Sequence, residues 1–323
     1  MMNVLFLCSE GFDYSSSQLT EGLHLLAKSK EINFKTVYKT NHHKAQVDDL
    51  ETISIEDAAD SCDWADLIIW NSGGDGRFSE DIRGRLLADD NTKRKRVLLD
   101  GHDSDALLWD PTELVVYYKR EYRYPHCSAT YHHNIRSFTF GVYNFLMDEL
   151  ASTGYYEDRD IDISFIAFGG SNEARLHTAS VLKQINGQVP KGSDRSFKVY
   201  VNVSENDQPL SIDEYISVMR RSKIGISIPG AGLDTLRFWE TMAHGAVLCS
   251  PDVTRNMVVR NAPEPHRHAL YFDKWQDMAE HCARTVLNSA RWVSMRRATD
   301  ELLWNHTTTE RARDFLCMFA EMA

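Results

Sequence analysis

The sequence lacks a long apolar run, a basic leader and a cysteine framework. No stretch approaches the roughly 20 apolar residues of a membrane-spanning helix, and the apolar run at the N-terminus covers only 4–8. None of the six cysteines belongs to a CxxC pair, and several stand in apolar runs. We therefore expect a cytoplasmic protein without a signal peptide, in which the cysteines are reduced core residues.

The chain also lacks the positive charge of a general nucleic-acid-binding protein. The 36 Lys and Arg residues stand against 47 Asp and Glu residues, so the formal net charge is −11. Such a balance disfavours sequence-independent binding to nucleic acid or to anionic membranes. The 323 residues suffice for two domains, and a hydrophobic content of 42% is typical of a globular protein.

Short apolar segments alternate with helical segments in both halves of the chain. Strands are predicted over 3–8, 34–38, 67–70, 96–100, 115–119, 163–168, 197–203, 224–228 and 246–249. Such alternation predicts parallel sheets with helices on both faces, and hence an α/β protein built from two Rossmann-like domains. The expected division is an N-terminal domain over 1–155, a C-terminal domain over 156–290 and terminal helices over 291–323. Another helix is expected over 138–150.

The most informative stretch runs from Ser222 to Pro251. A predicted buried strand ends at Ile228, and Pro-Gly-Ala-Gly at 229–232 then forms a loop with little side chain. Asp234 or Thr235 can cap the following helix. A small-residue loop that opens a helix presents free backbone N–H groups and the positive end of the helix dipole, which together suit a phosphate or carboxylate.

Two charged side chains follow on the same predicted helix. Arg237 can add a charge-assisted fork to the anion, and Glu240 can accept hydrogen bonds from the vicinal hydroxyls of a ribose. An anion beside a diol suggests a nucleotide diphosphate. The alternative is an ordinary βαβ unit in which Arg237 and Glu240 form an intrahelical ion pair. A second glycine loop, with Gly170, precedes another predicted helix, from which Arg175 could approach the same diphosphate.

The segment from Gly230 to Ala246 reads G-x-G-x-D-T-x-R-x-W-E-x-x-x-x-G-A. It resembles the donor-binding signature of GT-B glycosyltransferases, in particular the exostosin-like and CgeB-like branches of the group 1 glycosyl transferases. The resemblance implies two Rossmann-like domains that face each other across a cleft, with the donor in the C-terminal domain and the acceptor entering from the N-terminal one. It implies that Glu240 holds the ribose and that Arg237 lies near the diphosphate. The expected donor-binding residues are Gly170, Arg175, Gly230, Gly232, Asp234, Thr235, Arg237 and Glu240.

Polar loops at 9–14, 71–77 and 100–105 follow predicted strands, and ligands of parallel sheets bind at these strand ends. Inverting sugar transfer needs a base that takes the acceptor proton. His102 and Asp103 are the favoured pair, because an imidazole beside a carboxylate can be tuned towards neutral pH. The alternative is that such residues only cap strand ends. The candidates are Asp100, His102 and Asp103 for catalysis, and Glu10 and Asp13 on the acceptor side.

Together these features predict a glycosyltransferase, hexosyl or pentosyl, that uses a nucleotide-sugar co-substrate, most simply a UDP-sugar, and needs no cofactor or essential metal. Retaining GT-B enzymes often carry a second glutamate where this chain has Gly232, which leaves the stereochemical outcome open. The acceptor is open among a glycan, a small molecule, a protein and a hydroxylated nucleobase. The oligomeric state is open as well.

Three alternatives stand beside this prediction. Asp103 and Asp105 form a D-x-D, which metal-dependent GT-A transferases use to hold a divalent ion, although Asp158, Asp160 and Asp162 show that the pattern recurs easily. A nucleotide-sugar epimerase could share the two-domain plan. A binding protein that has lost catalysis is the third alternative.

Overall fold

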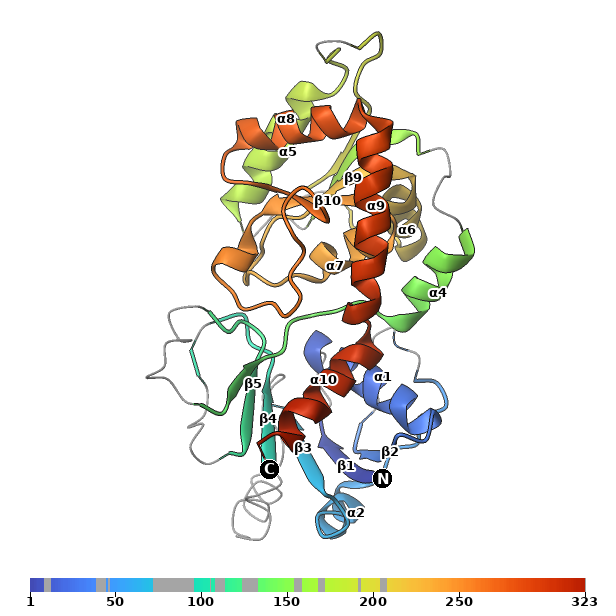
Figure 1. Cartoon of the computed structure of the whole chain (residues 1–323), viewed down its shortest axis with the longest axis vertical. Helices are drawn as coiled ribbons and strands as arrows, with labels where there is room; N and C mark the ends of the chain where they lie inside the picture. The colour runs from blue at the N-terminus through green and yellow to red at the C-terminus, as the bar shows by residue number, and fades with distance from the viewer. Residues whose placement is uncertain are drawn as a thin grey trace. The chain divides into compact units, whose positions relative to one another are not determined.

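The computed structural model describes residues 1–8, 13–38, 45, 47–71, 96–104, 106–107, 114–123, 133–153, 159–167, 172–190, 193–203 and 208–322. Glu10, Asp105 and Gly170 lie outside these ranges. The chain divides into two compact units (Figure 1). The first unit comprises Met1–Phe145, Asn256–Arg260 and His306–Ala323, and the second comprises Leu146–Arg255 and Asn261–Asn305.

The first unit is built on a six-stranded parallel sheet in the order β2-β1-β3-β4-β5-β6. Leu19 and Leu23 of α1 and Phe315 of α10 pack on one face of this sheet, and Ala58 of α2 packs on the other. Helix α10 lies beside α1 (Figure 1), where Gly22 permits close contact, since a Cβ there would collide with the carbonyl oxygen of Thr308. The strands and helices are β1 (Met2–Leu7), α1 (Tyr14–Lys28), β2 (Ile32–Thr36), α2 (Ile55–Asp60), β3 (Leu67–Asn71), β4 (Arg96–Asp100), β5 (Val116–Lys119), β6 (Ile135–Ser137) and α10 (Thr308–Ala320).

The second unit contains a five-stranded parallel sheet in the order β11-β10-β9-β7-β8. Its core joins Phe165 and Ile226 of the strands to Leu182 of α5 and Met278 of α8. The elements are β7 (Ile161–Ile166), α5 (Glu173–Ile185), β8 (Val199–Asn202), α6 (Ile212–Arg221), β9 (Ser222–Ile226), α7 (Leu236–Ala243), β10 (Val247–Pro251), η4 (Val253–Arg255), β11 (Ala269–Phe272), α8 (Trp275–Val286) and α9 (Ser289–Leu303). Helix α4 (Asn144–Thr153) and the short η5 (Trp304–His306) stand at the boundaries between the units.

The predicted α/β class with two parallel sheets is confirmed, but the helix expected over 138–150 begins only at Asn144. The preceding residues are extended because their backbone bonds elsewhere. The Gln18 side chain donates to the carbonyl oxygen of Gly141 and accepts from its N–H, at 2.9 and 2.8 Å, and Val142 pairs with Thr307. Strand β6 was not predicted, because the segment before it has no clear period.

Within the described ranges, none of the helices has the length and apolar character that crossing a membrane requires. The five described cysteines are Cys8, Cys62, Cys249, Cys282 and Cys317. Cys8, Cys249 and Cys282 are buried, as expected of core residues, whereas Cys62 is half-buried and Cys317 is exposed, so the expectation of core cysteines is wrong for Cys317.

Helix α9 runs past the C-terminal end of α7 and places Arg296 there. Its guanidinium donates to the carbonyl oxygen of Met242 at 3.1 Å and pairs with Asp300 one turn further along α9. Arg159 donates to the carbonyl oxygen of His244, the C-cap of α7, at 3.1 Å. Two positive charges therefore lie at the carbonyl end of α7, where the helix dipole is negative.

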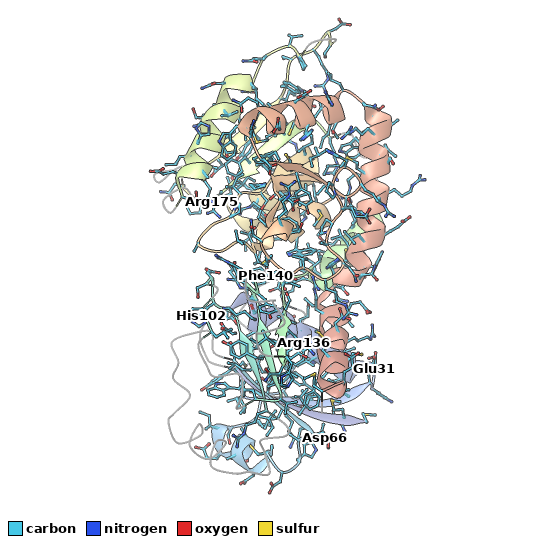
Figure 2. All side chains as sticks on the ribbon, turned by 60° about the vertical axis from the view of Figure 1, so that its left-hand side comes forward. Glu31, Asp66, His102, Arg136, Phe140 and Arg175 are labelled. Carbon is cyan, nitrogen blue, oxygen red and sulfur yellow. The ribbon has the colours of Figure 1, made fainter. Side chains whose placement is uncertain are left out.

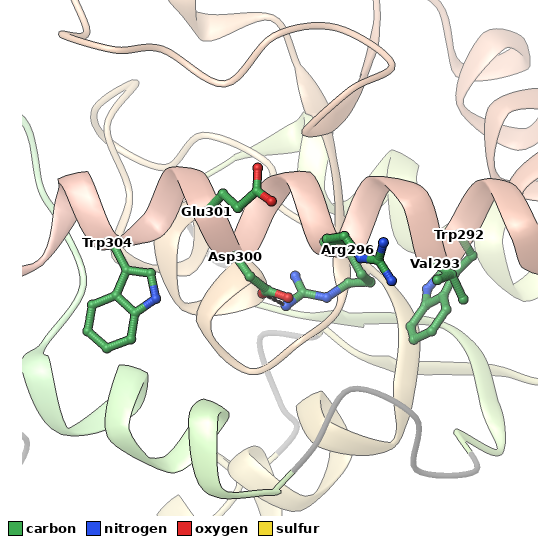
Figure 3. A pocket seen from close by; sticks show the side chains of 7 residues that line it. Trp292, Val293, Arg296, Asp300, Glu301 and Trp304 are labelled. Atoms are coloured by element: carbon green, nitrogen blue, oxygen red, sulfur yellow. Dashed lines mark hydrogen bonds and ion pairs between the residues drawn. The ribbon is translucent and has the colours of Figure 1, made fainter.

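The same stretch of α9 lines a pocket of about 310 Å³ (Figure 3). Trp292 and Trp304 provide apolar walls, and Asp300, which is only 3% exposed, also lines the pocket. Within the described part of the chain, Oδ2 of Asp300 has no hydrogen-bond partner. Burial raises the pKa of Asp300 to about 6, and the opposing effect of Arg296 does not cancel this rise.

This raised pKa predicts a pH dependence of stability. The folded protein holds the Asp300 proton more tightly than the unfolded chain does, so the resulting stabilisation is complete below about pH 3.8 and is lost as the pH rises through about 6. Urea unfolding gives the free energy of unfolding of the wild type and of Asp300→Asn at each pH. The value for the wild type minus the value for the variant should fall by about 1–3 kcal/mol between about pH 4 and 7. The exposed Asp213→Asn variant is the control. Parallel profiles for the wild type and Asp300→Asn would contradict the assignment.

Candidate functional site

At the carboxyl edge of the first sheet, Asp13 contacts Asn71 at the end of β3 and approaches Gly101 after β4. As the N-cap of α1, it accepts hydrogen bonds from the backbone N–H groups of Ser15 and Ser16, at 3.2 and 2.9 Å. Asn71, at the end of β3, donates to the same carboxylate at 3.2 Å. A Cβ on Gly101 would lie only 2.9 Å from Oδ1 of Asp13. Asp13, which we expected on the acceptor side, therefore caps α1 and holds the helix start against the edge of the sheet.

Asp100, the last residue of β4, is fully buried beside Lys119, the last residue of β5. The parallel register pairs the two residues, and Nζ of Lys119 lies 3.1 Å from Oδ2 of Asp100. The Tyr117 hydroxyl donates to the same oxygen at 2.5 Å. Both charged side chains are 0% exposed, so the attraction between them offsets the loss of hydration of each. Asp100 therefore serves as an acceptor for groups of its own unit.

The other carboxylate oxygen of Asp100 holds His102. The backbone N–H and Nδ1 of His102 lie 3.0 and 3.2 Å from Oδ1 of Asp100. We assign the proton of the neutral ring to Nδ1, which makes Nε2 an acceptor. The His102 side chain is 41% exposed, and the described residues offer Nε2 no hydrogen-bond partner (Figure 2). A ring oriented by a buried carboxylate, with an accessible acceptor nitrogen, has the geometry of a general base.

Asp103 does not orient His102, contrary to the expectation from its position next in sequence. It is 52% exposed and pairs with the buried Arg120. Nε of Arg120 also donates to the carbonyl oxygen of Gly101 at 2.9 Å, and its guanidinium lies 4.6 Å from the ring centroid of Phe140. The contact that we expected from Asp103 is made by Asp100, because Arg120 holds Asp103 in the loop.

Arginines also engage the carboxylates considered for a metal site, where the structure describes them. Asp103 pairs with Arg120, as stated above. The other pairs are Asp160 with Arg221, at 2.7 Å, and Asp162 with Arg195, at 2.6 Å. Burial alone would raise the pKa of Asp162, but the hydrogen bonds from Arg195, the backbone of Lys198 and Lys223 together outweigh it, so the pKa is lowered. Asp105 and Asp158 lie outside the described residues.

In the second unit, the loop after β9 leads into α7, whose N-cap is Thr235. The Thr235 hydroxyl accepts the backbone N–H of Phe238 at 3.3 Å. Asp234, the other expected cap, is buried and accepts a hydrogen bond from Nε1 of Trp239 at 3.3 Å. The carboxylate of Asp234 therefore stabilises the helix start through Trp239. The backbone of the loop closes on itself, since the N–H of Gly230 donates to the carbonyl oxygen of Gly232 at 3.1 Å.

Two arginines lie near each other beside this loop. Arg175, in the first turn of α5, donates to the carbonyl oxygen of Ile228 at 3.3 Å (Figure 2), and a Cβ on Gly230 would lie 2.7 Å from its Nη2. Burial and the neighbouring charge of Arg237 lower the pKa of Arg175. Among the described residues, Arg237 has no carboxylate partner, and its buried Nε has no hydrogen-bond partner. Two partly buried guanidiniums that lie close enough to influence each other favour the binding of an anion.

Glu240 follows Arg237 by one turn of α7, yet the two side chains do not pair. Instead, the Tyr215 hydroxyl of α6 donates to Oε2 of Glu240 at 2.7 Å. The Arg237 guanidinium lies over the Tyr215 ring, 5.4 Å from its centroid. The alternative of an intrahelical ion pair is therefore wrong. Glu240 is 8% exposed and shares the Tyr215 side chain with Arg237.

The sequence does not indicate the contacts that two contributors to these sites make, Lys119 and Tyr215. Lys119 meets Asp100 only because β4 and β5 are neighbours in register, which the local sequence does not reveal. Tyr215 follows the capping box that Ser211 and Glu214 form at the start of α6. That motif locates the helix start, but it does not indicate which side chain faces α7.

Known proteins resemble this chain in a family pattern and in fold. A family model described as glycosyl transferase-like matches residues 178–317, which include Arg237 and Glu240. No curated protein matches the chain. Three solved structures are similar over nearly their whole length. The first is an α-glucosyltransferase in complex with UDP-glucose and DNA containing an abasic site, with a TM-score of 0.64, 11% sequence identity and 99% of each chain covered. The second is a glycosyltransferase from Rickettsia africae ESF-5, with a TM-score of 0.66, 11% identity, and coverage of 99% of this chain and 98% of that one. The third is Anabaena Alr3699/HepE in complex with UDP-glucose, with a TM-score of 0.56, 8% identity, and coverage of 99% of this chain and 100% of that one. The chain has the GT-B fold.

Proposed function

We propose that the protein is a glycosyltransferase that moves a sugar from a nucleotide-diphosphate donor to a hydroxyl group. The observation that carries this proposal is the pair formed by Arg175 and Arg237 beside the 229–232 loop. A diphosphate placed between two guanidiniums would relieve their repulsion. It would also gain charge-assisted hydrogen bonds. The same positive charge would stabilise the diphosphate as it leaves the sugar.

In this proposal, Glu240 binds the nucleoside end of the donor. A carboxylate held near the phosphates can accept hydrogen bonds from the two ribose hydroxyls, as acidic residues do in dinucleotide-binding folds. We propose uridine as the base, because two similar solved structures are described as complexes with UDP-glucose. The donor would thus be bound by the second unit, and the acceptor by the first.

His102 is the residue that we propose as the base in an inverting transfer. Its Nε2 would take the proton of the acceptor hydroxyl while Asp100 stabilises the charged ring through Nδ1. One similar solved structure is a complex with DNA, so a hydroxylated nucleobase belongs in an acceptor panel with glycans and small alcohols. The net charge of −11 favours the latter two. The free thiols support a reducing, cytoplasmic location.

Arginine 237 provides the direct test of donor binding. Isothermal titration and thermal shift should show that the wild type binds UDP and that Arg237→Ala binds it about 10- to 100-fold more weakly, since about 1.5–3 kcal/mol of charge-assisted hydrogen bonding is lost. Arg284→Ala is the control, because Arg284 pairs with Glu280 on the exposed face of α8. A folded Arg237→Ala variant with wild-type affinity would remove the arginine pair from the site. Sugar derivatives of UDP, GDP, TDP, ADP and CMP then rank the donors.

Histidine 102 provides the test of the chemical step. His102→Ala should lower the rate of transfer by at least about 100-fold, the usual contribution of a general base, and should leave UDP affinity unchanged because the residue lies in the first unit. The rate is measured as UDP release across the acceptor panel, with an acceptor-free reaction as the blank. The exposed His133→Ala is the control. A rate within a few-fold of wild type would exclude His102 as the base.

Chelation separates this proposal from metal-dependent transfer. Because two guanidiniums would supply the positive charge at the leaving diphosphate, we expect turnover of the purified enzyme to be unchanged in excess EDTA. Added magnesium or manganese should then change the rate less than about twofold. A loss of turnover in EDTA that manganese restores would instead support a metal held under the diphosphate.

A further inference from the structure

We propose that Tyr215 is the positioning residue of the donor site, which keeps Arg237 and Glu240 apart so that one can receive the diphosphate and the other the ribose. This inference rests on the proposed function. It adds a residue that neither the motif nor its spacing identifies. It also explains why Arg237 and Glu240 do not pair with each other.

The contacts of Tyr215 reach both charged residues of the motif. Its hydroxyl donates to Oε2 of Glu240 at 2.7 Å. The face of its ring lies under the Arg237 guanidinium, with Cζ 5.4 Å from the ring centroid. His244, the C-cap of α7, packs edge-on against the ring, with centroids 6.1 Å apart. One side chain from α6 therefore holds α7 at three positions along its length.

Without such a residue, the two charges would neutralise each other. Arginine and glutamate three residues apart on a helix lie close enough to form an ion pair. That pair would cancel the positive charge needed for a diphosphate and occupy the carboxylate needed for a diol. In this protein the phenol bonds the carboxylate, and the electron-rich ring face attracts the guanidinium. Tyr215 thus satisfies each charge partially and leaves neither neutralised.

The chemical form of Tyr215 suits this role at all physiological pH values. Burial and the neighbouring Glu240 carboxylate raise the pKa of the Tyr215 phenol. The hydroxyl therefore stays protonated and donates, whereas a phenolate would repel Glu240. A phenylalanine at this position would keep the ring under Arg237 but would release the carboxylate.

The test uses Tyr215→Phe, which preserves the packing of the ring, and three probes measured by isothermal titration. The probes are inorganic pyrophosphate, UDP and 2′-deoxy-UDP. In the variant, Glu240 is free to pair with Arg237, so pyrophosphate affinity should fall roughly tenfold. The preference of the wild type for UDP over 2′-deoxy-UDP should shrink as well, because Glu240 no longer faces the ribose. A purely structural role would weaken all three probes equally.

The double variant Tyr215→Phe/Glu240→Gln separates positioning from loss of the phenol itself. A neutral amide cannot neutralise Arg237, so pyrophosphate affinity should return to within about threefold of wild type. The preference for UDP over 2′-deoxy-UDP should stay low. The urea midpoint of each variant reports its folding independently of any ligand.

Two results would overturn the role of Tyr215. One is wild-type pyrophosphate affinity and wild-type ribose preference in Tyr215→Phe. The other is a double variant that binds pyrophosphate as weakly as Tyr215→Phe alone. A wild type that binds none of the three probes would overturn the proposed function together with the role of Tyr215. The wild-type titration therefore distinguishes failure of the site from failure of this inference.

Discussion

The repulsion between two neighbouring guanidiniums is the constraint on which the second unit depends. A partly buried arginine without a counter-ion reduces the stability of the folded state, because it has lost water and gained no opposite charge. Arg237 is such a residue within the described part of the chain, and the proximity of Arg175 increases the cost. A fold whose net charge is −11 has many carboxylates that could neutralise this cluster. Even Glu240, which follows Arg237 by one turn of α7, does not pair with it, because the Tyr215 hydroxyl bonds that carboxylate.

The first unit shows the opposite arrangement. Its buried charges are matched within the fold, Asp100 by Lys119 and Asp103 by Arg120. Asp13 is likewise occupied by backbone N–H groups and by Asn71. Compensated charges of this kind hold strand ends and loops together, and they have little capacity left for a substrate. His102 differs from its acidic neighbours because its contact with Asp100 uses one ring nitrogen and leaves the other for chemistry.

The sequence predicted what depends on local pattern. Apolar runs and glycine loops located β4 and β9, and the helical spacing after Thr235 placed Arg237 in the first turn of α7. The contact between Asp100 and Lys119 could not be predicted, since it depends on which strands are neighbours and in which register. The sequence predicted too early a start for α4. The Gln18 side chain of α1 makes hydrogen bonds with the backbone N–H and carbonyl of Gly141, which therefore stays outside the helix. Likewise, the choice between an Arg237–Glu240 pair and a separated site depends on Tyr215, which comes from another helix.

Helix α7 connects these observations, because it is too short to be stable alone. A helix of eight residues in water is unfavourable by itself, so tertiary contacts must fix its direction. Tyr215 contacts it from the side, and Arg296 and Arg159 donate to the carbonyl groups at its C-terminal end. Since these arginines oppose the negative end of the dipole, they orient the helix as well as anchor it. The direction in which Arg237 and Glu240 project is therefore set by α6 and α9, so the proposed donor site depends on residues far from the glycine loop in sequence.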